Sequence, residues 1–424
     1  MAEWTAEVFE NEFLAADATD VHAIVTVTCK GAGTVSESSG DAAEIIIIDR
    51  SGSMSQPRAK IVAARAAAAE AIEEIVDGTW FAVIGGNQQA TMVYPHTPEL
   101  VRADEASRSS AKEAVRHLDP AGGTAIGSWL RAATELFNGV ESVQQHAILL
   151  TDGRNETESP EQLQAAIREA TGLFQCDCRG VGQDWDVNEL RGISSALLGS
   201  VDIIAEPALM EADFRAMMQA AMSRGVADAK LRIWAPQGSQ VLFVRQVAPT
   251  IEDLTARSIP VSALVRDFPT GSWGDESRDY HVSVRVPAKS IGAEMLAARV
   301  QVMVRDEVAA QGLVRATWSD DSALTTRINA AVAHYTGQAE LAEAIQDGLA
   351  AKAAGDDRTA TIKLGKAAQL AAATGDAEAT NRLKRVVDIE DADTGTVRLK
   401  RDASKLDEMA LDTASTKTTR VKKS

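Results

Sequence analysis

Three short segments carry hydroxyl and carboxylate side chains whose types and spacing could bind one cation. The first is Asp-Arg-Ser-Gly-Ser at residues 49–53, directly after the predicted buried strand 44–48. The second is Gly-Gly-Thr at 122–124, and the third is Thr-Asp-Gly at 151–153, directly after the apolar run 146–150. Because hard divalent cations take oxygen ligands, the sequence predicts a site for Mg²⁺ or a similar ion.

The charge of the candidate ligands indicates what such an ion would do. The ligands would be two carboxylates and three neutral hydroxyls, namely Asp49, Asp152, Ser51, Ser53 and Thr124. This set balances a divalent ion without exceeding its charge, so the ion would accept one more carboxylate from outside. We therefore predict a metal that is completed by an Asp or Glu residue of a partner protein. The residues beside the ligands that we expect to contact this partner are Arg50, Gly123 and Gly153.

Each segment also has an ordinary structural explanation when it is taken alone. An isolated Asp-x-Ser-x-Ser often caps the start of a helix, and Thr-Asp-Gly is a common turn sequence. Arg50 could form a surface salt bridge with Glu156 or Glu158, or it could help to receive an acidic partner. We prefer the metal site because the three segments arrive together at the ends of predicted strands.

The elements between these segments must hold them in place. Apolar strands and helices alternate from residue 44 to residue 222, with helices expected over 60–76, 104–118 and 208–222. Repeats of this kind with short connections predict a mostly parallel sheet with helices on both faces. In such a sheet, ligands bind outside the carboxyl ends of the strands, which is where the first and third segments lie.

These motifs resemble the metal-ion-dependent adhesion site of von Willebrand factor A domains. The order of strands and helices, including a short strand at 90–95, is also similar to that family, and the resemblance covers residues 41–225. It implies direct coordination of Mg²⁺, Mn²⁺ or Ca²⁺ by Ser51, Ser53 and Thr124. It also implies that Asp49 and Asp152 bind the ion directly or through water.

The chain as a whole resembles cytosolic von Willebrand A proteins of actinobacteria. Proteins of that kind are often found alongside Ser/Thr-kinase, phosphatase and FHA signalling components. The resemblance therefore suggests a role in kinase-linked signalling or in the assembly of complexes.

The rest of the chain predicts a β-sandwich that this domain interrupts. Segments after residue 228 alternate apolar and polar residues, and the early strand at 21–29 has no place in the α/β repeat. The predicted fold class is therefore α/β: a doubly wound, mostly parallel, Rossmann-like sheet inserted in a β-sandwich, followed by a small α-helical hairpin region. The predicted domains are 1–40 (first sandwich strand or strands), 41–225 (von Willebrand A domain), 226–321 (β-sandwich), 322–387 (helical hairpin) and 388–424 (hairpin and flexible tail).

Composition and charge exclude several classes of partner. The formal net charge of −18 argues against binding to nucleic acid or to anionic membranes. No apolar run approaches the ~20 residues that span a bilayer, and the start of the chain lacks a signal-peptide pattern. Three cysteines, Cys29, Cys176 and Cys178, do not make a disulfide framework. We expect a cytoplasmic protein that does not insert in a membrane.

Enzyme functions fit the sequence less well. An aspartyl phosphotransferase would need a second Asp two residues after Asp49, where the chain has Ser51. The Gly-Gly-Thr segment lacks the Gly-Lys of a phosphate-binding loop, and neither Ser51 nor Ser53 lies in a Gly-x-Ser-x-Gly sequence. Among six scattered histidines, His146 begins the strand that leads to Asp152, so we expect it to lie at the far end from the metal.

We therefore predict a non-enzymatic, divalent-metal-dependent protein-interaction scaffold. Two alternatives remain open. One is a Mg²⁺-dependent phosphotransferase or hydrolase that uses Asp49. The other is a scaffold whose main partner surface is the helical hairpin at 322–387.

Overall fold

A computed structural model describes residues 2–33, 42–141, 144–418 and 420 of the chain. The chain divides into two compact units, which we call the sandwich unit (residues 1–32, 228–270 and 275–424) and the α/β unit (residues 33–227 and 271–274). In the sequence, the α/β unit therefore lies between two parts of the sandwich unit. The predicted domain boundary at residues 40 and 41 lies outside the described residues.

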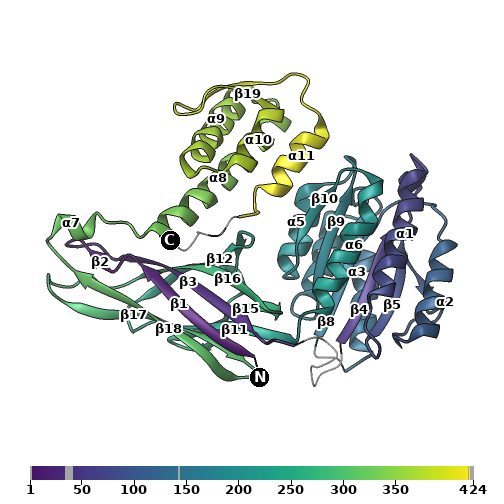
Figure 1. The fold of residues 1–424 in the computed structure, drawn as a ribbon, viewed down its shortest axis with the longest axis horizontal. Helices are drawn as coiled ribbons and strands as arrows, with labels where there is room; N and C mark the ends of the chain where they lie inside the picture. The colour runs from purple at the N-terminus through teal and green to yellow at the C-terminus, as the bar shows by residue number, and fades with distance from the viewer. Residues whose placement is uncertain (1, 34–41, 142–143, 419, 421–424) are drawn as a thin grey trace. The chain divides into compact units, whose positions relative to one another are not determined.

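The α/β unit is built on a seven-stranded sheet in the order β10-β9-β8-β4-β5-β6, with β7 paired to β5 (Figure 1). Its strands are β4 (Ala42–Asp49), β5 (Trp80–Gly86), β6 (Ala90–Tyr94), β7 (Val101–Arg102), β8 (Gln144–Thr151), β9 (Gln175–Val181) and β10 (Val201–Ile204). β6 and β7 run antiparallel to β5, and the other neighbours are parallel. The predicted α/β class with a mostly parallel sheet is confirmed.

Helices cover both faces of this sheet. They are α1 (Ala59–Glu73), α2 (Glu105–Arg116), α3 (Ile126–Asn138), α4 (Pro160–Ala170), α5 (Val187–Ala196) and α6 (Met210–Met222). Residues of α1, α2 and α6 share one buried core with Ile46 and Ile48 of β4. Side chains alternate along a strand, so Ile45 and Ile47 point to the opposite face, and they are also fully buried. The helix α3 packs against β4 and β5.

The sandwich unit contains two largely antiparallel sheets, in the orders β1-β3-β16-β12-β13 and β14-β15-β11-β17-β18-β2. Their strands are β1 (Glu3–Glu10), β2 (Phe13–Leu14), β3 (Asp20–Lys30), β11 (Val226–Trp234), β12 (Gln240–Ala248), β13 (Glu252–Asp253), β14 (Ile259–Ser262), β15 (Val265–Trp273), β16 (Glu276–Arg285), β17 (Glu294–Val304) and β18 (Glu307–Trp318). β3 pairs with β16, so the chain before the α/β unit and the chain after it share one sheet. β1, which pairs with β3 along its whole length, is a strand that the sequence reasoning missed.

The region predicted as a helical hairpin contains more than a pair of helices. α8 (Ala330–Ala353) and α9 (Asp357–Thr374) are its two arms, preceded by α7 (Ser322–Thr325) and followed by α10 (Ala377–Val386). α9 ends at Gly375, whose φ of 68° is left-handed, and the side chain of Asp376 then caps α10. The Gly-Asp pair thus ends one helix and begins the next. Within the described residues, no helix combines the length and the apolarity needed to cross a membrane.

The segment after residue 388 corrects the prediction of a flexible tail. The predicted hairpin is present as β19 (Val387–Asp391) and β20 (Thr396–Leu399), but the helix α11 (Lys405–Ala414) follows it. Met409 and Leu411 of this helix are buried, and Leu411 shares a core with α8, α9 and α10. The prediction weighed the charges of this segment, whereas its apolar residues decide the structure. Residues 419 and 421–424 of the predicted tail lie outside the described residues.

Candidate metal site

Two of the three candidate loops leave neighbouring strands at the same edge of the sheet. β4 ends at Asp49 and β8 ends at Thr151, and the two strands pair in parallel so that Ile48 lies opposite Leu150. Asp49 and Asp152 therefore emerge side by side. The third loop, at residues 122–124, precedes α3 and is tied to the first by a hydrogen bond from the Gly52 amide to the Gly122 carbonyl, 2.9 Å long.

Hydrogen bonds join four of the five predicted ligands into one chain. The Ser51 amide donates to Asp49 Oδ1 at 2.6 Å, and the Ser51 and Ser53 hydroxyls lie 2.8 Å apart. Ser53 Oγ donates in turn to Asp152 Oδ1 at 2.6 Å. The two carboxylates, which are 103 positions apart in the sequence, thus share one polar cluster through two serines.

Thr124, the fifth predicted ligand, faces the same space from the other side. A Cβ atom added to Gly153 would lie 3.2 Å from Thr124 Oγ1, 3.7 Å from Ser53 Oγ and 4.0 Å from Asp49 Oδ2. One point beside the Gly153 backbone, in the third loop, is therefore within 4.0 Å of oxygen atoms from the first and second loops. The structure brings all five predicted ligands together, and any side chain at residue 153 would crowd them.

Burial makes the two carboxylates costly to hold without a cation. Asp49 and Asp152 are both fully buried. Burial raises the pKa of Asp49 to about 6; hydrogen bonds from Ser51 and Thr151 oppose this shift, and the charge of Asp152 adds to it. The donors to Asp49, the Ser51 amide and the Thr151 hydroxyl, are neutral. An ion at this point would supply the positive charge that the buried Asp49 lacks.

Lys60 is a cation in this cluster that the sequence reasoning missed. It lies at the start of α1, is only 7% exposed, and donates from Nζ to Asp152 Oδ2 at 2.7 Å. It also lies 3.9 Å from the exposed Asp184. A lysine at the start of the otherwise Ala-rich helix 59–73 is the signal that could have pointed to it. Lys60 neutralises Asp152, so the carboxylate of Asp49 is the net charge left in the cluster.

The donor set fits a hard divalent cation. It consists of carboxylate and hydroxyl oxygens, and these are the ligand types that Mg²⁺, Mn²⁺ and Ca²⁺ prefer. Ser53 and Gly122 are exposed, so the cluster is open to solvent between the first and second loops. Groups of three or more His, Cys, Asp or Glu side chains with metal-binding geometry are absent from the described part of the chain, so the hydroxyls are essential to this candidate.

The three residues predicted to contact a partner lie around this opening and are each half-buried. The Gly123 amide donates to Gln88 Oε1 at 3.1 Å. Among the described residues, Arg50 forms neither of the salt bridges considered above, with Glu156 or with Glu158; Glu158 pairs with Arg131 at 3.0 Å. The Arg50 Nη1 atom instead lies 3.4 Å from the Asp119 carbonyl oxygen.

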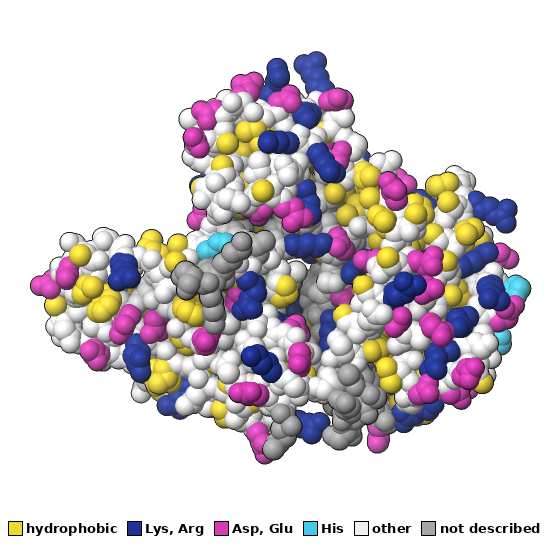
Figure 2. All heavy atoms as spheres, viewed as in Figure 1, with side chains coloured by type: hydrophobic (Ala, Val, Ile, Leu, Met, Phe, Trp, Pro, Cys, Tyr) yellow, Lys and Arg dark blue, Asp and Glu magenta, His cyan; other side chains and the backbone are white. Residues whose placement is uncertain are grey.

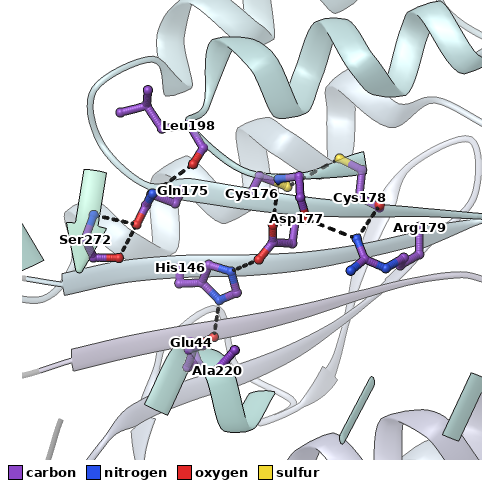
Figure 3. Close-up of polar contacts among 12 residues, drawn as sticks. Glu44, His146, Gln175, Cys176, Asp177, Cys178, Arg179, Leu198, Ala220 and Ser272 are labelled. Atoms are coloured by element: carbon purple, nitrogen blue, oxygen red, sulfur yellow. Dashed lines mark hydrogen bonds and ion pairs between the residues drawn. The ribbon is translucent and has the colours of Figure 1, made fainter. Parts of the chain in front are cut away.

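A second buried polar cluster lies on the same strands, nearer their starts (Figure 3). His146 of β8 lies between two carboxylates, with Nδ1 at 2.8 Å from Glu44 Oε2 of β4 and Nε2 at 2.9 Å from Asp177 Oδ2 of β9. Burial by itself would lower the pKa of His146, but the charge of Glu44 and the hydrogen bonds that the imidazole donates to both carboxylates outweigh it and raise the pKa to about 9. The imidazole is therefore a cation that joins three strands.

This cluster is not placed for catalysis. Glu44, His146 and Asp177 are 0%, 1% and 7% exposed, so a substrate has no access to them. The His146 charge and the neighbouring arginines Arg224 and Arg179 keep the pKa of Asp177 below its usual value in spite of burial. Sequence reasoning placed His146 far from the candidate metal but did not find its partners. Acidic residues within otherwise apolar strands, Glu44 above all, were the available signal.

Comparisons with known proteins identify the family of the chain. The family profile for the von Willebrand factor type A domain matches residues 43–203, and that for the von Willebrand factor type A C-terminal domain matches residues 369–415. A search of curated proteins gave no match.

Among solved structures, one relative matches this chain over nearly all of the residues of both. A von Willebrand factor type A protein from Catenulispora acidiphila is 47% identical, with a TM-score of 0.94 over 99% of this chain and 97% of that one. The ArnB paralog VWA2 from Sulfolobus acidocaldarius has a TM-score of 0.59 at 14% identity, over 98% of both chains. Human COPII-coat protein Sec24c has a TM-score of 0.55 at 10% identity, over 89% of this chain and 58% of that one. The last two share the fold alone, whereas the identity and coverage of the first confirm the predicted resemblance: the chain belongs to the von Willebrand factor type A family.

Proposed function

We propose that this protein is a non-enzymatic interaction scaffold that captures a partner protein through a divalent metal ion. The observation that carries the proposal is the convergence of oxygen atoms from Asp49, Ser53 and Thr124 around one point beside Gly153. Ser51 and Asp152 complete this set through hydrogen bonds to Ser53. These five residues would hold the ion.

Mg²⁺ is the ion that we propose, with Mn²⁺ and Ca²⁺ as substitutes. When bound, the ion supplies a coordination position for a carboxylate of the partner. The chain's own residues keep that position available: Lys60 neutralises Asp152, and the remaining ligands are hydroxyls. The site would therefore carry too little negative charge to saturate a divalent ion and would favour an acidic side chain from outside.

The alternative use of Asp49 as a phosphoryl acceptor has less support. Asp49 Oδ1 accepts the Ser51 amide and Asp49 Oδ2 accepts the Thr151 hydroxyl, both at 2.6 Å, and the residue is fully buried. Both carboxylate oxygens are thus engaged away from solvent. Ser51 also occupies the position where a phosphotransferase would carry its acid–base aspartate.

Capture of partners with and without metal tests the proposal. The full-length protein would be immobilised and exposed to lysate in Mg²⁺ or in EDTA, and retained proteins would be identified by mass spectrometry. We expect a partner that is retained in Mg²⁺ and lost both in EDTA and with Asp49→Ala. Asp119→Ala is the matched control, because it removes a nearby carboxylate whose side chain is 88% exposed. Retention that is equal in all four conditions contradicts the proposal.

We also propose a cytoplasmic location and a role in Ser/Thr-kinase-linked signalling or complex assembly. The free, buried thiols of Cys29, Cys176 and Cys178 support a reducing compartment. The identity of the captured partner tests the pathway: a kinase, a phosphatase or a substrate of either is the expected result.

A further inference from the structure

A groove of about 850 Å³ lies in the α/β unit beside the candidate metal site. Its walls are β6, the turn that follows it and α2 from Ser109 onward, and Arg50 also lines it. The volume is within the range of sites that hold a ligand, roughly 300–1,000 Å³. The neutral walls include the hydroxyls of Thr91 and Ser109, which can hydrogen-bond to an anion.

Arg50 connects this groove to the metal loop. Its backbone is fixed by hydrogen bonds from Arg50 N to the Gly86 carbonyl and from Ala121 N to the Arg50 carbonyl, each 2.7 Å long. Its side chain leaves the loop over Gly85, where an added Cβ would lie only 3.0 Å from Arg50 Cδ. The absence of a side chain at residue 85 therefore lets the guanidinium reach the groove.

The guanidinium of Arg50 has unused hydrogen-bonding capacity. Among the described residues its Nε atom is buried and lacks a hydrogen-bond partner. Its Nη1 atom makes a single long contact, 3.4 Å to the Asp119 carbonyl oxygen. A buried, unsatisfied donor of a charged group is costly, and an incoming carboxylate would relieve that cost.

The charge of the groove is opposite to that of the protein. The chain carries −18 overall, yet Arg50, Lys112 and Arg116 line this groove together with His96 and His117. Glu113 is the carboxylate in the lining and pairs with Arg116 at 2.6 Å, and Lys112 pairs with Glu73 of α1. With neutral histidines the lining sums to +2, or to +1 when Glu73 is included. In Figure 2, Lys, Arg and His side chains lie with acidic ones at the edge where Figure 1 labels α2.

We propose that the groove between β6 and α2 binds an acidic peptide segment of the partner whose Asp or Glu completes the metal site. This inference rests on the proposed function and adds the chemistry of the partner: further Asp or Glu residues beside the one that reaches the metal. Exposed ion pairs such as Arg116–Glu113 contribute little to stability, so their cations can turn to a ligand's carboxylates. Nucleic acid fits less well, because the rest of the acidic surface would repel a long polyanion.

A fluorescent hexaglutamate peptide is a direct probe. Its binding to the full-length protein in saturating Mn²⁺ would be followed by fluorescence anisotropy, with hexaglutamine as the uncharged control peptide. We expect Lys112→Gln/Arg116→Gln to weaken hexaglutamate binding by about three- to tenfold, as two exposed charge contacts allow. Arg50→Met should weaken it at least as much, because this guanidinium is partly desolvated.

The matched control is Lys384→Gln/Arg385→Gln, which removes the same charge from two exposed positions on α10. Mn²⁺ binding, measured by isothermal titration calorimetry, separates the groove from the metal site and should be unchanged in both double variants. Three results would overturn the proposal that the groove binds an acidic peptide. They are an equal loss of hexaglutamate binding in the two double variants, no loss in either, and no hexaglutamate binding by the Mn²⁺-loaded protein. A wild-type protein that does not bind Mn²⁺ overturns the proposed function first.

Discussion

The same two strands carry both polar clusters of the α/β unit, and the two clusters differ in what surrounds them. At the starts of β4 and β8, Glu44 and His146 meet Asp177 inside the sheet, where strands and helices cover them. At the ends, five residues further along β4, Asp49 enters a cluster made by loops. Five residues of extended chain span about 16 Å, so the two clusters are independent sites.

The difference separates buried carboxylates that have a fixed counterion from one that lacks it. Glu44 and Asp177 have a permanent cation, the His146 imidazole, between them. Asp152 has Lys60, but the donors to Asp49 are neutral and the neighbouring Ser53 is exposed. A buried charge without a fixed cation, next to an opening, is suited to bind a cation that comes and goes.

Removing the cation of the closed cluster should give the largest effect. His146→Gln leaves Glu44 and Asp177 buried without their counterion, and we expect it to destabilise the α/β unit by about 3–5 kcal/mol near pH 6. Amide hydrogen exchange of β8 and β4 measures this opening free energy locally. Mn²⁺ affinity at pH 6 should stay within about twofold of wild type while the unit remains folded, since the clusters are ~16 Å apart. A strong loss of Mn²⁺ binding by the folded variant would show that the two clusters are coupled.

Replacing Asp49 should have the opposite effects: it should weaken Mn²⁺ binding and stabilise the metal-free protein. Asp49→Asn is expected to lower Mn²⁺ affinity by more than about 100-fold, because even changes to outer partners of a metal ligand cost about 10–100-fold. In metal-free buffer at pH 8 it should also raise the melting temperature, since it removes an ionised carboxylate whose burial raises its pKa to about 6. Calorimetric titration and differential scanning calorimetry check the two effects. Ser55→Ala, an exposed hydroxyl in the same loop, is the control and should change neither quantity.

The pH dependence of stability tests the charge of the His146 cluster over a defined pH range. The folded-state pKa of His146 is raised from 6.5 to about 9, so its stabilising contribution is fully present below pH 6.5 and is lost as the pH rises through 9. The raised pKa of Glu44 acts in the same direction, since ionised Glu44 is disfavoured by burial. The stability difference between wild type and His146→Gln should therefore shrink from pH 6.5 to pH 9. A difference that grows over this window contradicts a charged His146.

The smallest of these effects should come from Lys60. Lys60→Met removes a cation that competes with the metal for Asp152, and we expect Mn²⁺ to bind about tenfold more tightly. The metal-free protein should become less stable, because Asp152 loses its ion pair, and added Mn²⁺ should restore the loss. Lys60→Arg keeps the charge and is the control. Mn²⁺ binding by Lys60→Met that equals or falls below wild type would show that Lys60 supports the site instead.

Local pattern was sufficient for the fold class and for the candidate ligands. The alternation of apolar strands and helices gave the mostly parallel sheet, and a parallel sheet places successive loops at one edge whatever its strand order. That is why Asp49 and Asp152 could be placed together before any distance was known. The hydroxyls at Ser51 and Ser53 follow from their spacing within one short loop.

Other features depended on contacts that local pattern does not contain. The tail was predicted from its charges, but Leu411 finds a core built by α8, α9 and α10 and orders α11. β1 forms because β3 offers it a free edge, and one sequence shows no such edge. Arg50 reaches the groove because residue 85, on a neighbouring strand, is glycine.

The amino-acid sequence by itself determined the types and spacing of the candidate oxygen ligands, the strand ends that present them and the family to which the chain belongs. The tertiary structure alone decided what each buried carboxylate contacts. Asp152 meets the cation Lys60, and Glu44 and Asp177 meet the cation His146. Asp49 meets only neutral donors among the described residues. The physical reason is the distance along the chain over which each effect acts. Periodicity acts over a few residues, whereas the free energy of a buried charge depends on side chains that the sheet order brings to it from about 100 residues away.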